Sequence, residues 1–432
     1  MYLDQRSTAG AARVRLSGLQ LRIILLCAAV TLVDGFDTQS IAFVAPHIVD
    51  VWRVSPVLFA PVFAAGLLAS FIGALVLGPM GDRVGRKPAL VISLAIFAAG
   101  SLGTAFSDSI ASLIAMRLVT GLGLGGALPC SITLASEHAP AERRESLVSL
   151  MFCGFPLGAV LGGLSSEAMV ALWGWKSVFI VGGLLPIVLG ALFVPLVPES
   201  ASFLASRGSS APGNASAGRT APSSRAVTVH LLFTEGRAVG TLLLWTTLFL
   251  SLLLTYFLIS WIPLIARASG ANVRAGVIAV SLLNLGAVCG SIPLGRLGDR
   301  YSPWRVIRAG FAAGAVPIFF IGLGQHSPVL LCVATFVAGM LSIGAQMCTV
   351  SYAAALYSTQ LRGTGVGWAM GIGRLGAIAG PMLGGLLVNV SMNPPILFAF
   401  AAGVSLAAGG SMWALGTTGS GLAEQIVDDG TR

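Results

Sequence analysis

Apolar stretches of about 20 residues recur along nearly the whole chain, and this recurrence limits the possible folds more than any other feature. A helix rises ~1.5 Å per residue, so about 20 residues cross the ~30 Å hydrocarbon core of a bilayer. The sequence therefore predicts an all-α integral membrane protein. Twelve spans are expected, at residues 22–46, 57–80, 88–107, 110–134, 146–168, 175–197, 239–263, 274–297, 304–323, 327–352, 364–388 and 394–416.

The composition agrees with a membrane protein and indicates its orientation. Only 9% of the 432 residues are charged, whereas soluble domains are about one quarter charged. Of the 25 Lys and Arg residues, 19 fall on one side of the predicted membrane, 4 on the other and 2 within spans. By the positive-inside rule, both tails are predicted to be cytoplasmic, in a multi-pass protein of the inner (plasma) membrane. The net charge of +9 thus reflects topology, and no pattern suggests nucleic-acid binding.

The spans divide into two halves that repeat. Residues 198–238 form one long polar interruption, rich in Ser, Gly and Pro, that reads as a cytoplasmic linker. Gly-Asp-Arg at 81–83 recurs at 298–300, and Leu-Gly-Ala at 157–159 recurs at 375–377, at offsets of 217 and 218. We therefore predict two pseudo-symmetric six-helix bundles, 22–197 and 239–416, between cytoplasmic tails at 1–21 and 417–432. Transporters built from parallel repeats bind substrate between the halves near the midplane, although repeats alone do not exclude a channel.

Two carboxylates interrupt the first span. A charge at the bilayer centre costs at least ~2.5 kcal/mol, so Asp34 and Asp37 are expected to be functional. They are three residues apart and share a helical face, where two carboxylates cannot both ionise cheaply. They are candidates for proton coupling. The alternative is a structural pair neutralised by Arg117.

Two arginines are expected at the same depth. Counting ~1.5 Å per residue from the span ends, Arg117 and Arg374 lie near the middle of the membrane with both carboxylates. They belong to opposite halves, and each offers a planar pair of donors to a carboxylate. Arg374 breaks the repeat, since Pro156 holds the matching position, and is favoured as the substrate anchor. Arg117 is either a second substrate contact or the standing partner of an aspartate.

Several motifs carry a family resemblance. Residues 78–87, G-P-M-G-D-R-V-G-R-K, match the G-x-x-x-D-R-x-G-R-K loop of the major facilitator superfamily. The strings D-G-F-D-T-Q (34–39), R-L-V-T-G-L-G-L-G-G-A-L-P (117–129) and R-G-T-G-V-G-W-A-M-G-I-G-R-L-G-A (362–377) resemble its aromatic acid/proton symporter family, both hydroxybenzoate and hydroxyphenylpropionate carriers. The resemblance covers almost the whole chain.

The resemblance implies roles for particular residues. The charged residues implied to matter for transport are Asp34, Asp37, Asp82, Arg117, Arg362 and Arg374. Glu137 resembles a family position and is expected to join Asp82 and Arg143 in a gating network, with Arg83, Gly85 and Arg86 of the same loop. Aromatic candidates for stacking on a substrate ring are Phe36, Phe155, Tyr256 and Trp368. For each, packing between helices is the alternative.

The predicted function is uptake of an aromatic carboxylate by proton symport through alternating access. Two alternatives remain: proton-coupled efflux of an organic anion, and a sensor that binds aromatic acids without moving them. We expect a monomer whose partners are the aromatic acid, protons and the lipid bilayer. No cofactor or metal site is expected, because the six cysteines form no C-x-x-C pair and the four histidines are scattered. No nucleophile is paired with a base, so an enzyme is not expected.

Overall fold

A computed structural model describes residues 17–140, 144–199, 229–234, 236–268, 273–324, 327–357, 361–390 and 393–418. Within these ranges the chain is helical and contains no strand. The helices are α1 (Gly18–Trp52), α2 (Phe59–Val84), α3 (Arg86–Ala105), α4 (Ile110–His138), α5 (Arg144–Phe152), α6 (Gly154–Trp173), α7 (Lys176–Leu196), α9 (Ala238–Ala268), α10 (Val273–Arg300), α11 (Pro303–Leu323), α12 (Pro328–Ala338), α13 (Gly344–Leu356), α14 (Arg362–Val390) and α15 (Pro394–Thr418). Short turns of other helix types lie at η1 (Pro56–Leu58), η3 (Val229–Phe233) and η5 (Gly339–Ile343).

The prediction of twelve membrane spans is confirmed: the described residues contain twelve helical segments that are long and apolar enough to cross a bilayer. Two of the predicted spans are composite. The fifth consists of α5 and α6, which meet at Cys153, and the tenth consists of α12, the π-helical turn η5 and α13. The first span is longer than predicted. A capping box of Ser17 and Gln20 starts α1 early, and the helix continues through Pro46 to Trp52.

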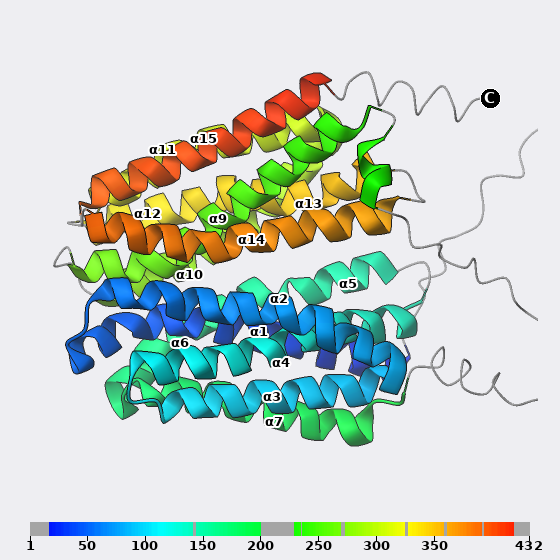
Figure 1. Ribbon diagram of the computed structural model, residues 1–432, viewed down its shortest axis with the longest axis vertical. Helices are drawn as coiled ribbons and strands as arrows, with labels where there is room; N and C mark the ends of the chain where they lie inside the picture. Colours follow the sequence, from blue (N-terminus) through cyan, green and yellow to red (C-terminus); the bar gives the residue numbers. More distant parts are fainter. Residues whose placement is uncertain are drawn as a thin grey trace, which may run out of the picture.

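The helices form two bundles. In Figure 1, α1 to α7 lie together on one side and α9 to α15 on the other. We call these groups the N half and the C half. The end at which α1 begins and α15 ends is the tail end, and the opposite end, where α1 stops at Trp52, is the far end. Residues 1–16, 200–228 and 419–432, which include most of the predicted tails and linker, lie outside the described residues.

The two halves contact each other toward the far end. Gln39 of α1 and Asn284 of α10 exchange two side-chain hydrogen bonds, of 3.0 and 2.9 Å. Nearer the far end, Asp50 of α1 forms an ion pair with Arg267 of α9. The ring of Phe63 in α2 also meets Trp261 of α9 edge-on, with centroids 6.1 Å apart. These contacts close the far end of the interface between the halves.

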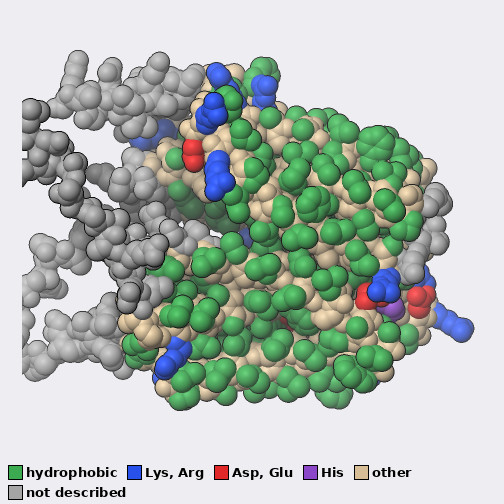
Figure 2. Space-filling model, turned by 180° about the vertical axis from the view of Figure 1, so that it is seen from behind, with side chains coloured by type: hydrophobic (Ala, Val, Ile, Leu, Met, Phe, Trp, Pro, Cys, Tyr) green, Lys and Arg blue, Asp and Glu red, His purple; other side chains and the backbone are tan. Residues whose placement is uncertain are grey.

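The outer surface suits a lipid environment. Figure 2 shows hydrophobic side chains over most of the visible face, with charged side chains mainly near the two ends. Large apolar side chains such as Leu75, Val76 and Leu406 are more than half exposed and lie away from the ends of their helices. An apolar belt bounded by charged ends is the pattern expected of a bundle that spans a membrane.

Candidate functional site

A cavity of about 160 Å³ lies between the halves, lined by α1, α2, α4 and α6 on one side and α9 and α14 on the other. Most of its lining is apolar. All four side chains predicted to converge at mid-depth line it: Asp34, Asp37, Arg117 and Arg374. The cavity therefore combines an apolar wall with two carboxylates and two guanidinium groups.

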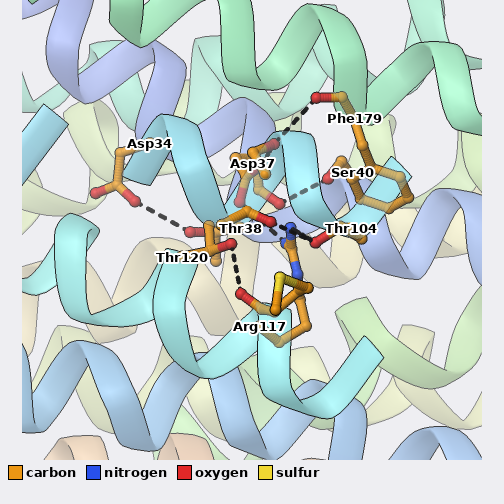
Figure 3. A network of polar contacts seen from close by, with 11 residues as sticks. Asp34, Asp37, Thr38, Ser40, Thr104, Arg117, Thr120 and Phe179 are labelled. Atoms are coloured by element: carbon orange, nitrogen blue, oxygen red, sulfur yellow. Dashed lines mark hydrogen bonds and ion pairs between the residues drawn. The ribbon is translucent and has the colours of Figure 1, made fainter. Parts of the chain in front are cut away.

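One arginine of the cavity is already paired. Arg117 Nη1 lies 3.0 Å from Asp37 Oδ2, and Nη2 donates to Thr104 Oγ1 at 2.9 Å. Asp37 Oδ1 accepts a 2.8 Å hydrogen bond from Ser101, and the Arg117 guanidinium lies 5.1 Å above the ring of Phe179. Figure 3 shows this network, which draws on α1, α3, α4 and α7. Both charged side chains are at most 3% exposed, so the pair is buried, and of the guanidinium nitrogens only Nε of Arg117 has no hydrogen-bond partner among the described residues.

The other carboxylate is differently placed. Asp34 accepts a 3.0 Å hydrogen bond from Thr38, one turn further along α1, and points away from Asp37 in Figure 3. It is 4% exposed, and among the described residues no cation lies within ion-pair distance of it. Although Asp34 and Asp37 share a helix and a cavity, only Asp37 has a standing counter-charge.

The second arginine crosses from one half to the other. Arg374 of α14 reaches Ser70 of α2, to whose Oγ its Nη1 donates at 3.2 Å. Arg374 is half-buried, and no carboxylate of the described residues lies within ion-pair distance of it. Its guanidinium thus faces the cavity with a neutral hydroxyl as its partner. A ligand carboxylate would be a stronger partner than this hydroxyl, because it carries the opposite charge and can accept two parallel hydrogen bonds from the guanidinium.

Two of the four predicted aromatic residues line the cavity. Phe155 of α6 and Tyr256 of α9 face it from opposite halves. Phe36 instead belongs to the hydrophobic core, because it is about 200° around α1 from Asp34. Trp368 is 46% exposed and stacks on Trp245, with ring centroids 6.1 Å apart. It precedes Arg374 by six residues and lies on another face of α14, so neither Phe36 nor Trp368 lines the cavity.

The predicted gating residues lie at the tail end. Gly85 adopts a φ of 111°, which glycine allows without strain, and so makes the turn between α2 and α3. Arg83 is exposed beside it, and Glu137 is half-buried near the end of α4. The side chains of Asp82 and Arg362, and the whole of Arg143, lie outside the described residues. The structure thus describes only part of the expected network.

A carboxylate that the sequence analysis missed also lies at this end. Glu199, just after α7, accepts hydrogen bonds from the backbone N–H groups of Arg86 and Lys87 at 3.0 and 3.3 Å. These are the first N–H groups of α3, which have no partner within the helix. The Lys87 ammonium also donates to the Val194 carbonyl at 2.7 Å. The loop motif is therefore tied to the end of α7, 112 residues away in sequence.

The chain matches known proteins over most of its length. The Major Facilitator Superfamily profile matches residues 27–288 and 244–425. The chain is 37% identical to a gallate transporter of Pseudomonas putida, and the match covers 91% of this chain and 93% of that protein. It is 38% identical to the 4-hydroxybenzoate transporter PcaK of Pseudomonas aeruginosa, over 88% of each. It is 36% identical to a 3-(3-hydroxy-phenyl)propionate transporter of Escherichia coli, over 89% of this chain and 91% of that one.

Solved structures share the fold. A crystal structure of a D-xylose-proton symporter superposes with a TM-score of 0.72 at 17% sequence identity, covering 91% of this chain and 97% of that chain. At this identity the similarity concerns the fold alone. It agrees with the two bundles described above, each of which contains six of the twelve spans found in the described residues.

Proposed function

The chain belongs to the major facilitator superfamily, and from that premise we propose that it takes up an aromatic carboxylate by proton symport through alternating access. Its relatives are named as transporters of aromatic acids, and the cavity between the halves has both charged groups and an apolar wall. We place the protein in the inner membrane with both tails on the cytoplasmic side, following the distribution of basic residues.

The observation that carries the proposal is the unequal pairing of the two cavity arginines. Arg117 has Asp37 as its counter-ion at 3.0 Å, whereas Arg374 has the hydroxyl of Ser70 at 3.2 Å. Both bonds have a charged donor, but a substrate carboxylate brings an opposite charge and a second acceptor oxygen to Arg374, which the neutral Ser70 hydroxyl does not. A substrate carboxylate therefore competes well for Arg374. We propose Arg374 as the anion anchor, with Phe155 and Tyr256 beside the ring.

The same charges suggest how a proton is coupled. Asp34, Asp37, Arg117 and Arg374 sum to zero when all are ionised, and a monovalent substrate anion adds one negative charge. One proton on a cavity carboxylate restores neutrality. Asp37 is held by Arg117 and Ser101, so we assign the exchanging proton to Asp34 alone. This is narrower than the expectation from sequence, which named both aspartates.

Alternating access supplies the remaining step. We propose that the far end is the external face, so that the contacts of Gln39 with Asn284 and of Asp50 with Arg267 close the cavity from outside. Outward opening would break these contacts. Tail-end closure is assigned to the loop and its neighbours, namely Asp82, Arg83, Gly85, Arg86, Glu137 and Arg362.

The test is uptake of radiolabelled 4-hydroxybenzoate by proteoliposomes with an acidic outside. Symport predicts concentrative uptake that collapses when a protonophore dissipates the gradient. Antiport predicts concentrative uptake only with the gradient reversed, and a sensor predicts binding with no flux. Either of these last two results would contradict the proposal.

A further inference from the structure

Arg117 and Arg374 both line the cavity, but Arg374 has only a neutral hydroxyl as its partner, whereas Arg117 already has a carboxylate counter-ion. The Asp37 carboxylate already occupies the Arg117 guanidinium at 3.0 Å. Building on the proposed function, we propose that Asp37 is a specificity determinant: an internal anion that restricts the cavity to ligands with a single carboxylate.

The surroundings of the ion pair make it hard to displace. Ser101 holds one oxygen of Asp37 at 2.8 Å, Thr104 accepts from Arg117 at 2.9 Å, and Phe179 covers the guanidinium. Ser101 and Thr104 are fully buried, so these groups cannot exchange their partners for water. A ligand carboxylate that took Arg117 would leave Asp37 buried without a counter-charge. Losing one partner of a buried ion pair costs more than a single charged hydrogen bond returns.

The ion pair and the proposed anchor share one cavity. Asp37, Arg117 and Arg374 all line the same space of about 160 Å³, so a ring held at Arg374 lies in the cavity that contains the ion pair. A second ligand carboxylate would find no cation there without a counter-ion, because Arg374 holds the first carboxylate and Arg117 is paired with Asp37. Replacing Asp37 with a neutral residue would release Arg117 to accept that second carboxylate.

The experiment measures competition against radiolabelled 4-hydroxybenzoate by the purified full-length protein in nanodiscs at neutral pH. The competitors are benzoate, the three isomeric benzenedicarboxylates, and the monomethyl ester of each dicarboxylate. Each ester has nearly the bulk of its parent but only one charge. For the wild type we expect benzoate and at least one ester to bind at least about tenfold more tightly than any dicarboxylate. Equal competition by a dicarboxylate and benzoate overturns the inference, and so does rejection of all esters together with the dicarboxylates, which would indicate size instead of charge.

The variants test whether Asp37 causes the discrimination. In Asp37→Asn, at least one dicarboxylate should gain about tenfold or more relative to benzoate. The double variant Asp37→Asn/Arg117→Gln should lose that gain, and Asp108→Asn, the same change at an exposed position before α4, should match the wild type. Absence of any gain in folded Asp37→Asn overturns the inference. If that variant does not fold, the wild-type comparison of acids with esters decides. A wild type that binds no aromatic acid would contradict the proposed function itself. That result differs from a failure of this inference alone, in which the wild type binds benzoate and dicarboxylates equally.

Discussion

The amide pair between Gln39 and Asn284 gives the sharpest test of how the far end closes. Gln39 Nε2 donates to Asn284 Oδ1 at 3.0 Å, and Asn284 Nδ2 donates back to Gln39 Oε1 at 2.9 Å and also to the Val280 carbonyl at 2.9 Å. Gln39 is fully buried and Asn284 is 5% exposed. Replacing one partner by Leu leaves the other amide buried without its partner, which costs about 1–3 kcal/mol. That cost applies when the far end is closed and falls when opening admits water.

Each single variant should therefore favour the form that is open at the far end, by about 5-fold to 150-fold in the equilibrium constant. Asn284→Leu should have the larger effect, because Gln39 then loses both bonds, whereas in Gln39→Leu the Asn284 amide still donates to Val280. In the double variant Gln39→Leu/Asn284→Leu no amide remains to be desolvated. Its shift should be smaller than the sum of the single shifts.

Distances between spin labels can measure this equilibrium. Val51, at the end of α1, and Val329, at the start of α12, lie on opposite halves at the far end and are 65% and 74% exposed. The labels require a background in which the exposed Cys153 and Cys289 are replaced by Ala. The single variants should increase the population with a long distance between the labels. Unchanged distances in both single variants, or strictly additive shifts in the double variant, would refute the reasoning.

Three further predictions concern the anchor, the charge balance and helix packing. Arg374→Lys keeps the charge but loses the planar pair of donors, so the affinity for substrate should fall about 10–100-fold. The control Arg308→Lys, at an exposed position of α11, should bind substrate as the wild type does. Equal affinities of the two variants would exclude Arg374 as the anchor. One-to-one symport of a monovalent acid moves no net charge, so a potassium-diffusion potential at equal pH should drive no accumulation of substrate. Transport with a second proton would instead give roughly fifty-fold accumulation of substrate per 100 mV. Concentrative uptake under these conditions would overturn the one-to-one stoichiometry. Gly35→Ala should lower the melting temperature in detergent, because the added Cβ would overlap the backbone of Phe155 in α6 and reduce the stability of the fold by about 1–3 kcal/mol. The control is Gly403→Ala, since nothing lies within 4 Å of a Cβ added there. Equal melting temperatures of the two variants would contradict this packing.

Hydropathy and helical rise were enough to predict the spans and the meeting of the four charged side chains at one cavity. The apolar runs are long, and depth along a helix is simply a count of residues at ~1.5 Å each. The position around the helix is a stricter requirement. Phe36 and Trp368 lie near the charged residues in sequence, but their angular positions turn them away from the cavity. Aromatic type and sequence proximity therefore did not identify the residues that line it.

The distinction between Asp34 and Asp37 was not predictable from the sequence. It depends on Ser101 and Thr104 of α3, and a hydroxyl in a membrane helix usually bonds its own backbone. Thr104 does so as well, donating to the Gly100 carbonyl at 2.8 Å while accepting from Arg117. Its second role appears only once α3 is packed against α4. Likewise, nothing in the sequence joins Gln39 to a residue 245 positions away.

Counting the protons that enter with the substrate tests whether Asp34 carries the transported proton. Proteoliposomes with a trapped pH dye and radiolabelled 4-hydroxybenzoate outside report both fluxes in one experiment. For the wild type we expect one proton per substrate molecule. In Asp34→Asn, substrate exchange between loaded vesicles and medium should continue while proton uptake with the substrate disappears. Substrate-linked proton uptake that persists in Asp34→Asn, or its absence in the wild type, would rule out proton transport through Asp34.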